Sequence, residues 1–381
     1  MRILILGGTL FLGRHLVKAA LVQGHTVALF NRGQSNADIF PEIEKLRGDR
    51  TVDMSALRGR IWDAVIDTSG YIPRAVEAGA TLLRESTRHY AFVSSLTVYA
   101  DLSLPDIRED APLLDLEPFR AEQELTPQSY GPLKALCEQA VEEAFGARAL
   151  IARPGLIVGA HDYTNRSAYW VQRLADGGEV LAPGMPDRRI QLIDARDLAS
   201  WLVRMAEAGQ GGVYNVTGPE QPLTMGQFLA SCTAVVSGEA TLTWVDGQFL
   251  VDRDVAYWSE LPLWLPESVP WRLDISKAIQ SGLEFQPIDG TMLTYMHGLA
   301  LAVSNGLSNL CGRAAARWTL ASSERRKHLC WTSGDSGRVD TPNAATPHLA
   351  PRSSFRLTTA GRLLIVPVSA HLGRHLSAAR E

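Results

Sequence analysis

Short aliphatic runs alternate with amphipathic stretches along the first 155 residues. Runs of four or five mostly apolar residues are typical of strands buried on both faces of a parallel sheet. They occur at 3–6, 26–30, 64–67, 89–93 and 149–152. Apolar residues at helical spacing predict helices over 11–21, 75–83 and 127–145, the last with Pro127 in its first turn, where proline is favoured. Strands that alternate with helices predict an α/β fold with a Rossmann-type, doubly wound parallel sheet.

The pattern changes after residue 155. Predicted helices over 169–175, 198–208 and 225–236 alternate with short strands over 189–193, 213–216 and 241–245, and a last helix follows Asp274. We therefore expect a dinucleotide-binding Rossmann domain over 1–155 and a smaller α/β substrate-binding region over 156–303. Strands after residue 180 are free to rejoin the first sheet.

Residues 304–381 have neither a helical nor a strand period and hold 11 Lys and Arg against 4 Asp and Glu. Residues 1–303 hold 26 against 37. A segment with so little apolar patterning cannot offset its ordering entropy. We predict a basic, low-order tail, expected to be disordered, that contributes nothing to fold or catalysis; a basic arm that binds an acidic partner is the alternative.

The bulk composition, 46% hydrophobic and 20% charged, is ordinary for a soluble protein. The four cysteines are scattered without a Cys-x-x-Cys pair, which fits a reducing, cytoplasmic compartment and no metal site. No apolar run reaches the length of a membrane span. The acidic body argues against general affinity for nucleic acid.

Gly7, Gly8 and Gly13 lie between the first predicted strand and the first predicted helix. Such a unit aims backbone N–H groups and the positive end of a helix dipole at one point, where a pyrophosphate can bind. Gly8 would allow the phosphate to approach closely, and Gly13 would allow tight helix packing. Leu10 stands where the G-x-x-G-x-x-G fingerprint has its middle glycine, so the loop alone also fits an ordinary βα turn.

Asn31 and Arg32 follow the second predicted strand, where an acidic residue would bind the ribose 2′-hydroxyl of NAD. An arginine there can accommodate a 2′-phosphate, so we expect NADP to be favoured over NAD. Asp49 is placed to meet the adenine. The alternative for Arg32 is a solvated turn residue.

Tyr130 and Lys134 are four residues apart, on one face of a predicted helix. A nearby ammonium stabilises a phenolate and lowers the pKa of a tyrosine. Ser95 follows a predicted strand and would point into the crevice at the carboxyl ends of the strands, where it can orient a substrate oxygen. These three residues predict proton exchange with a substrate oxygen.

Five segments occur in the order seen in extended short-chain dehydrogenases/reductases, the NAD-dependent epimerase/dehydratase family, which the chain resembles over residues 1–300. The segments are 7–13, 93–99, 130–134, 153–155 and 193–198. The resemblance implies catalysis by Ser95, Tyr130 and Lys134. The cofactor-binding residues that it implies, together with those predicted above, are Gly7, Gly8, Thr9, Leu10, Phe11, Leu12, Gly13, Asn31, Arg32, Asp49, Pro154, Gly155 and Leu156.

Two departures from the family pattern matter. Leu10 replaces the middle glycine, as in an atypical branch that includes chloroplast stem-loop-binding proteins, some of which bind RNA. Leu96 and Thr97 replace the Asp-Glu pair of the 4,6-dehydratases, which counts against dehydration. Candidates for the substrate wall are Thr97, His161, Arg166 and Arg189, of which the arginines can hold a diphosphate or be ordinary surface residues.

The resemblance implies an NAD(P)-dependent epimerase or reductase that acts by hydride transfer on a carbonyl or secondary alcohol, with a nucleotide sugar as one substrate class. We expect a small-molecule substrate and no nucleic-acid or membrane partner, and a homodimer is left open. Two alternatives are a catalytically inactive, cofactor-binding regulatory protein and an RNA-binding member of the atypical branch. A binding protein has no physical need for the Tyr130–Lys134 pair.

Overall fold

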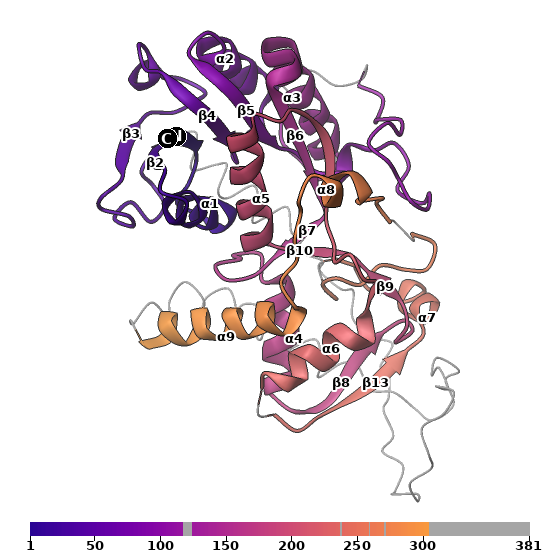
Figure 1. Cartoon of the computed structure of the whole chain (residues 1–381). Helices are drawn as coiled ribbons and strands as arrows, with labels where there is room; N and C mark the ends of the chain where they lie inside the picture. The colour runs from indigo at the N-terminus through magenta and orange to yellow at the C-terminus, as the bar shows by residue number, and fades with distance from the viewer. Residues whose placement is uncertain (117–123, 237, 259, 270–271, 305–381) are drawn as a thin grey trace, which may run out of the picture.

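The computed structural model describes residues 1–116, 124–236, 238–258, 260–269 and 272–304 (Figure 1). A parallel sheet of seven strands lies at its centre, in the order β11-β6-β5-β4-β1-β2-β3. The strands are β1 (Arg2–Leu6), β2 (Thr26–Asn31), β3 (Glu44–Arg47), β4 (Trp62–Asp67), β5 (Thr87–Val93), β6 (Ala149–Pro154) and β11 (Gly212–Val216). The predicted doubly wound, Rossmann-type sheet is confirmed.

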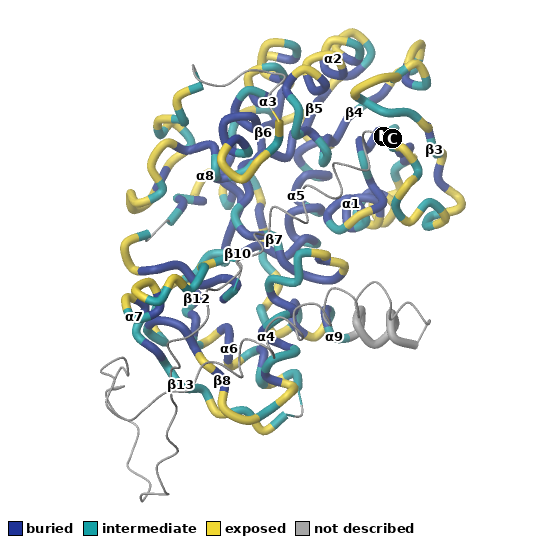
Figure 2. The backbone as a smooth tube through the Cα atoms, turned by 180° about the vertical axis from the view of Figure 1, so that it is seen from behind, coloured by how far each residue is buried: buried dark blue, intermediate teal, exposed yellow. Residues whose placement is uncertain are grey.

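Alternate side chains of each strand enter two separate cores. In β1, Ile3 and Ile5 pack with α1 (Phe11–Val22) and α5 (Ala195–Ala208) on one face of the sheet. Leu4 and Leu6 pack with α2 (Pro73–Leu83) and α3 (Tyr130–Phe145) on the other face. Both faces of the sheet are therefore covered, which is why its strands read as unbroken apolar runs. Figure 2 shows the inner strands of this sheet buried, whereas exposed residues lie in the outer loops and on the outward faces of the helices.

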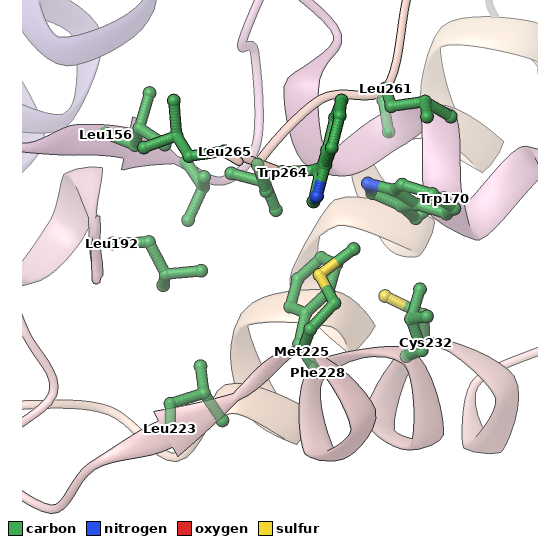
Figure 3. Packing of buried hydrophobic residues seen from close by; sticks show 14 of the residues in the cluster. Leu156, Trp170, Leu192, Leu223, Met225, Phe228, Cys232, Leu261, Trp264 and Leu265 are labelled. Carbon is green, nitrogen blue, oxygen red and sulfur yellow. The ribbon is translucent and has the colours of Figure 1, made fainter. Parts of the chain in front are cut away.

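A second, smaller unit lies below the sheet. Its strand pairs are β7 (Leu156–Val158) with β10 (Leu192–Asp194), β8 (Gly178–Pro183) with β13 (Ala240–Val245), and β9 (Arg189–Ile190) with β12 (Leu223–Thr224). Its helices are α4 (Arg166–Ala175), α6 (Met225–Ala234), α7 (Gly247–Val251) and α9 (Ile288–Ser304). In its core Trp170 and Trp264 lie against Met225 and Phe228 (Figure 3).

The chain returns from the smaller unit to the large sheet. α5 packs against α1, and β11 pairs with β6 in parallel register, Tyr214 opposite Ala152. The short helix α8 (Ser276–Gln280) then packs against β11. Residues between 195 and 216 therefore complete the unit that begins at residue 1.

Two predicted elements are wrong in detail. α3 begins at Tyr130 and not at Pro127, because Thr126 and Ser129 hydrogen-bond each other's backbone N–H groups, at 2.8 and 3.1 Å, and close a turn before the helix. The predicted strand 189–193 is two strands, β9 and β10. The side-chain amide of Gln191 interrupts it by making two hydrogen bonds with the backbone of Leu273.

β8 was not predicted from the sequence, since a glycine and a proline stand at its ends. The predicted tail falls, apart from Ser304, outside the described residues. In the described part of the chain no helix is long and apolar enough to cross a membrane.

Candidate active site

The loops that follow β1, β2, β4, β5 and β6 lie at the carboxyl edge of the large sheet (Figure 1). The direction in which successive strands are added reverses at β1, which has β2 on one side and β4 on the other. In open α/β sheets, ligands bind outside the carboxyl ends of the strands at such a reversal. The predicted cofactor residues lie in these loops or in the elements that border them, apart from Asp49, which follows β3.

The glycine loop fits a bound diphosphate. Gly7 and Gly8 have φ angles of +111° and +90°, which side chains rarely allow, and a Cβ on Gly8 would lie 2.5 Å from Leu29 Cδ2. A Cβ on Gly13 would lie 2.7 Å from Gly8 Cα, so the missing side chain lets the first turn of α1 pack on the loop. Leu10, at the N-cap, has a side chain that cannot cap the helix. The first N–H groups of α1 can therefore bind an anion.

Two arginines lie beside the end of β2: Arg32 follows this strand, and Arg47, the last residue of β3, is paired with Asn31. Arg32 Nη1 is 3.9 Å from Asp49 Oδ2, and Arg47 donates to Asn31 Oδ1. Asp49 also accepts hydrogen bonds from the backbone and the hydroxyl of Thr51, at 2.8 and 2.6 Å. Arg32 and Arg47 therefore place positive charge where the sequence predicts the ribose 2′-phosphate of NADP.

Ser95, Thr97 and Tyr130 come together beside β5. Ser95 caps the short helix η2 (Leu96–Val98), and its Oγ accepts from the Thr97 backbone at 3.2 Å and from the Thr97 hydroxyl at 2.9 Å. The side chain of Tyr130 lies near that of Ser95. Burial raises the pKa of Tyr130, while the hydroxyl of Ser95 and the charge of Arg166 oppose that shift.

Lys134 lies one turn beyond Tyr130 and is buried. Its Nζ donates to the carbonyl oxygens of Gly70 and Val93, both at 2.7 Å, and lies 4.1 Å from the ring centroid of Phe92. Burial lowers the pKa of Lys134 to about 8. An ammonium has three donors, so one N–H is left for a further acceptor.

The turn after β6 packs against the end of β11. A Cβ on Gly155 would overlap the hydroxyl of Thr217, and the Gly155 N–H donates to Val216 O at 3.2 Å. The Thr217 hydroxyl is buried and has no hydrogen-bond partner among the described residues. Contacts with the end of β11 therefore fix the backbone conformation of the turn formed by Pro154, Gly155 and Leu156.

The four predicted substrate residues lie in different places. Thr97 and Arg166 lie at the Tyr130 site. His161 lies against α1, with its ring centroid 5.9 Å from that of His15. Arg189 is an exposed residue of β9 and lines a pocket of the smaller unit with Leu156 and Trp264.

A buried ion pair beside the site was not predicted. Arg50 donates to both oxygens of Asp67 at 2.9 Å, and the Tyr90 hydroxyl donates to the same carboxylate at 2.9 Å. Burial opposes ionisation of Asp67, but Arg50 holds the pKa of that carboxyl below its usual range. The available signal was the acid at the end of an apolar strand, because a buried carboxylate needs a partner.

Tyr71 was also missed. Its ring centroid is 6.4 Å from that of Tyr130, and Lys134 Nζ is 5.4 Å from its centroid. Among the described residues, no group of three or more His, Cys, Asp or Glu side chains could hold a metal ion.

Comparison with known proteins shows related sequences and folds. One relative, the chloroplast stem-loop binding protein of 41 kDa b from Arabidopsis thaliana, is 28% identical over 251 residues, 61% of this chain. The match spans 62% of the length of that relative.

Solved structures of low sequence identity share the fold. The enzyme WbmH of Bordetella bronchiseptica, in complex with NAD+, has a TM-score of 0.57 and 17% identity over 78% of this chain and 98% of its own. UDP-glucose 4-epimerase of Thermotoga maritima, with UDP-glucose, has a TM-score of 0.58 and 15% identity over 80% of this chain and all of its own. UDP-glucuronic acid 4-epimerase of Bacillus cereus, with NAD, has a TM-score of 0.55 and 15% identity over 79% of this chain and 97% of its own.

The family model described as the NAD dependent epimerase/dehydratase family matches residues 3–217. This match covers the glycine loop, Ser95, Tyr130 and Lys134, and it confirms the family that the sequence motifs predicted. The chain belongs to the NAD-dependent epimerase/dehydratase family.

Proposed function

We propose that this protein is an NAD(P)-dependent epimerase or reductase that acts on a carbonyl or secondary alcohol with Ser95, Tyr130 and Lys134. The observation that carries the proposal is the closeness of the Ser95 side chain to Tyr130, one helical turn before Lys134. A hydroxyl pair and an ammonium at the cofactor edge of the sheet are the groups that hydride transfer to a carbonyl needs. A protein that only binds the cofactor has no use for this set.

Each residue has a role that its environment supports. Tyr130 exchanges a proton with the substrate oxygen, and Ser95 hydrogen-bonds the same oxygen. Lys134 stabilises the Tyr130 phenolate by its charge and has one N–H left for a ribose hydroxyl. The nicotinamide supplies or accepts the hydride when the cofactor is bound.

NADP is the proposed cofactor in preference to NAD. Asn31 replaces the acid that would bind a ribose 2′-hydroxyl, and Arg32 and Arg47 supply two guanidinium groups at the end of β2. Guanidinium groups bind phosphate through paired, charge-assisted hydrogen bonds. Two of the fold relatives named above, WbmH and UDP-glucuronic acid 4-epimerase, are in complex with NAD, so the proposed preference for NADP rests on this chain's own residues.

The proposed substrate is a nucleotide sugar or another polar carbonyl compound. Arg166 carries a positive charge close to Tyr130, and Thr97 lies next to Ser95. The substrate named with the Thermotoga maritima structure, UDP-glucose, is one candidate for this site.

The test is a turnover screen with purified protein. NADPH and NADH are offered with UDP-glucose, UDP-glucuronic acid, dTDP-glucose and simple aldehydes and ketones, and both sugar epimerisation and cofactor absorbance are followed. We expect turnover with at least one substrate and a loss of that turnover in Tyr130→Phe. Turnover that is unchanged in Tyr130→Phe would contradict the assigned mechanism.

RNA binding is a second candidate function, favoured by the name of the Arabidopsis relative. It is tested by titrating a labelled RNA hairpin at two salt concentrations, because phosphate contacts make affinity salt-dependent. RNA binding that survives Tyr130→Phe and Lys134→Met, together with no turnover of any carbonyl, would favour this function over the enzyme.

A further inference from the structure

Arg153, the residue before Pro154, is buried at the end of β6. Its guanidinium group hydrogen-bonds several other residues of the protein. Its Nε donates to Glu138 Oε1 at 3.1 Å, and its Nη2 donates to Glu138 Oε2 at 2.7 Å. Its Nη1 donates to the Tyr99 hydroxyl at 3.1 Å and to the carbonyl oxygen of Glu109 at 3.0 Å. One guanidinium therefore joins segments that are far apart in the sequence.

Two of the partners, Glu138 and Tyr99, lie on segments that carry proposed catalytic groups. Glu138 lies on α3, one turn beyond Lys134 and two turns beyond Tyr130. Tyr99 ends the short helix η2 that Ser95 begins. Arg153 itself leads into the Pro154–Gly155 turn.

The groups that contact Arg153 through Tyr99 and Glu109 are also held in place by hydrogen bonds. The Tyr99 hydroxyl donates to Asn215 Oδ1 at 2.5 Å, and Asn215 lies in β11 opposite Arg153. The Asn215 backbone N–H donates to Glu109 Oε1 at 2.8 Å. Because these groups are buried and mutually hydrogen-bonded, a shift of any one leaves a buried polar group unpaired.

We propose that Arg153 is a positioning residue that sets Tyr130 and Lys134 on α3 relative to Ser95 on η2. The inference rests on the proposed function. The paired bonds to Glu138 hold α3, and the bond to Tyr99 holds η2, so the position of Tyr130 relative to Ser95 depends on one side chain. Lysine at this position keeps the charge but cannot form both contacts, because an ammonium lacks the planar fork.

The first experiment compares Arg153→Lys with a matched control, Arg196→Lys. Arg196 also forms paired hydrogen bonds with a carboxylate, Asp194, but on α5. We expect kcat of Arg153→Lys to fall by about tenfold to a hundredfold, as misplaced catalytic groups do, with KM for the cofactor unchanged. The control keeps its kcat, and melting temperatures are measured for both.

The second experiment does not depend on turnover. The Cζ resonance of Tyr130 is observed in protein labelled with 13C-tyrosine, assigned with Tyr130→Phe, and compared with Ser95→Ala, in which the hydroxyl near Tyr130 is absent. We expect Arg153→Lys to move this resonance toward its Ser95→Ala position and Arg196→Lys to leave it in place. If Arg153→Lys does not fold, Tyr99→Phe is used, since it removes only the hydroxyl that links Arg153 to Asn215.

The outcomes separate the two proposals. Wild-type protein without turnover would reject the proposed function, and the Tyr130 resonance would still test the positioning role. A folded Arg153→Lys or Tyr99→Phe protein with wild-type kcat and an unmoved resonance would overturn the inference. Equal losses of kcat in Arg153→Lys and Arg196→Lys would also overturn it, because they would reveal a general effect of losing an ion pair.

Discussion

The side-chain amide of Asn31 donates to the carbonyl oxygen of Gly7 across 2.8 Å. Its oxygen accepts from the Gly33 N–H at 3.0 Å and from Arg47. Asn31 therefore ties the end of β2 to the glycine loop and stands beside Arg32 without sharing its proposed role. An acidic residue at this position would lack the donor and would repel the Gly7 carbonyl.

The first prediction separates Asn31 from Arg32. We expect Asn31→Ala to weaken NADPH and NADH binding by the same factor, because the loop that holds the shared diphosphate loses its tie to β2. Arg32→Ala should weaken NADPH alone, by roughly 10- to 150-fold, which corresponds to about 1.5–3 kcal/mol for a charge-assisted hydrogen bond. Isothermal titration calorimetry measures both.

Arg88→Ala is the control for Arg32→Ala, because Arg88 has an 86% exposed side chain on β5. It should bind both cofactors like the wild type. Tighter binding of NADH than of NADPH by the wild type, indifferent to Arg32→Ala, would mean that the end of β2 does not select the 2′-phosphate.

Most of the large sheet could be predicted because its strands are short and buried on both faces. The apolar runs that begin at Ile3 and Ala64 are enough by themselves to predict strands. The glycines between the first strand and the first helix predict the loop that joins them. The smaller unit was predicted less well. Its strand pairs are short, and an interruption such as that at Gln191 depends on Leu273, which is 82 residues away in the chain.

Long-range pairing also limits what can be predicted of the site. Ser95, Tyr130 and Lys134 follow from a motif with a fixed spacing. In the sequence, Arg153 is only a charged residue before a proline. Nothing in the neighbouring residues indicates that it hydrogen-bonds Tyr99, which is 54 residues away in the chain. Such networks follow from the packing of α3 and η2 on β6, which a single sequence does not encode locally.

Tyr130→Phe should remove most turnover and leave the fold and cofactor affinity nearly intact, because only one hydroxyl is lost. General acid–base catalysis typically contributes about 10²- to 10⁴-fold, and a loss of this order in kcat/KM is expected. Circular dichroism and cofactor titration check that the protein is otherwise unchanged.

Activity should fall as the pH rises through about 8, because burial lowers the pKa of Lys134 to about 8. Asp67, Cys137 and Glu138 favour the ammonium form, and Arg50 disfavours it. Below this pH Lys134 carries the positive charge that, in the proposed mechanism, stabilises negative charge developing on the Tyr130 oxygen, and above it that charge is lost. A profile of kcat/KM from pH 6 to 10 measures the fall.

Unfolding does not explain the predicted fall. In the unfolded chain Lys134 has its ordinary pKa of 10.5, so between about pH 8 and 10.5 the unfolded state binds more protons at this residue. The free energy of unfolding that Lys134 contributes therefore rises with pH in this window. A rate that stays constant up to pH 10 would show that the ammonium is not required.

Removal of residues 305–381 should leave the melting temperature and cofactor binding unchanged. The described elements, from β1 to the end of α9 at Ser304, already contain the glycine loop, the proposed catalytic residues and all three cores described above. Differential scanning calorimetry of the truncated and full chains tests this. A lower melting temperature, or hydrogen-exchange protection of amides between 310 and 380, would assign the tail a structural role.

Gly13→Ala should destabilise the protein and weaken cofactor binding together. The added Cβ would lie 2.7 Å from both Cα and N of Gly8, so the helix or the loop must move. Overpacking of this kind costs roughly 1–3 kcal/mol, and the moved atoms are those that would contact the diphosphate.

Gly290→Ala in α9 is the matched control for this change, because, apart from its chain neighbours and the nearby backbone of its own helix, no described heavy atom lies within 4 Å of its added Cβ. Alanine exceeds glycine in helix propensity by roughly 1 kcal/mol, so the control should be neutral or slightly stabilising. Urea unfolding and cofactor titration are compared for both variants. If Gly13→Ala matched Gly290→Ala in stability and bound cofactor like the wild type, the contact of α1 with Gly8 would not be what requires glycine at position 13.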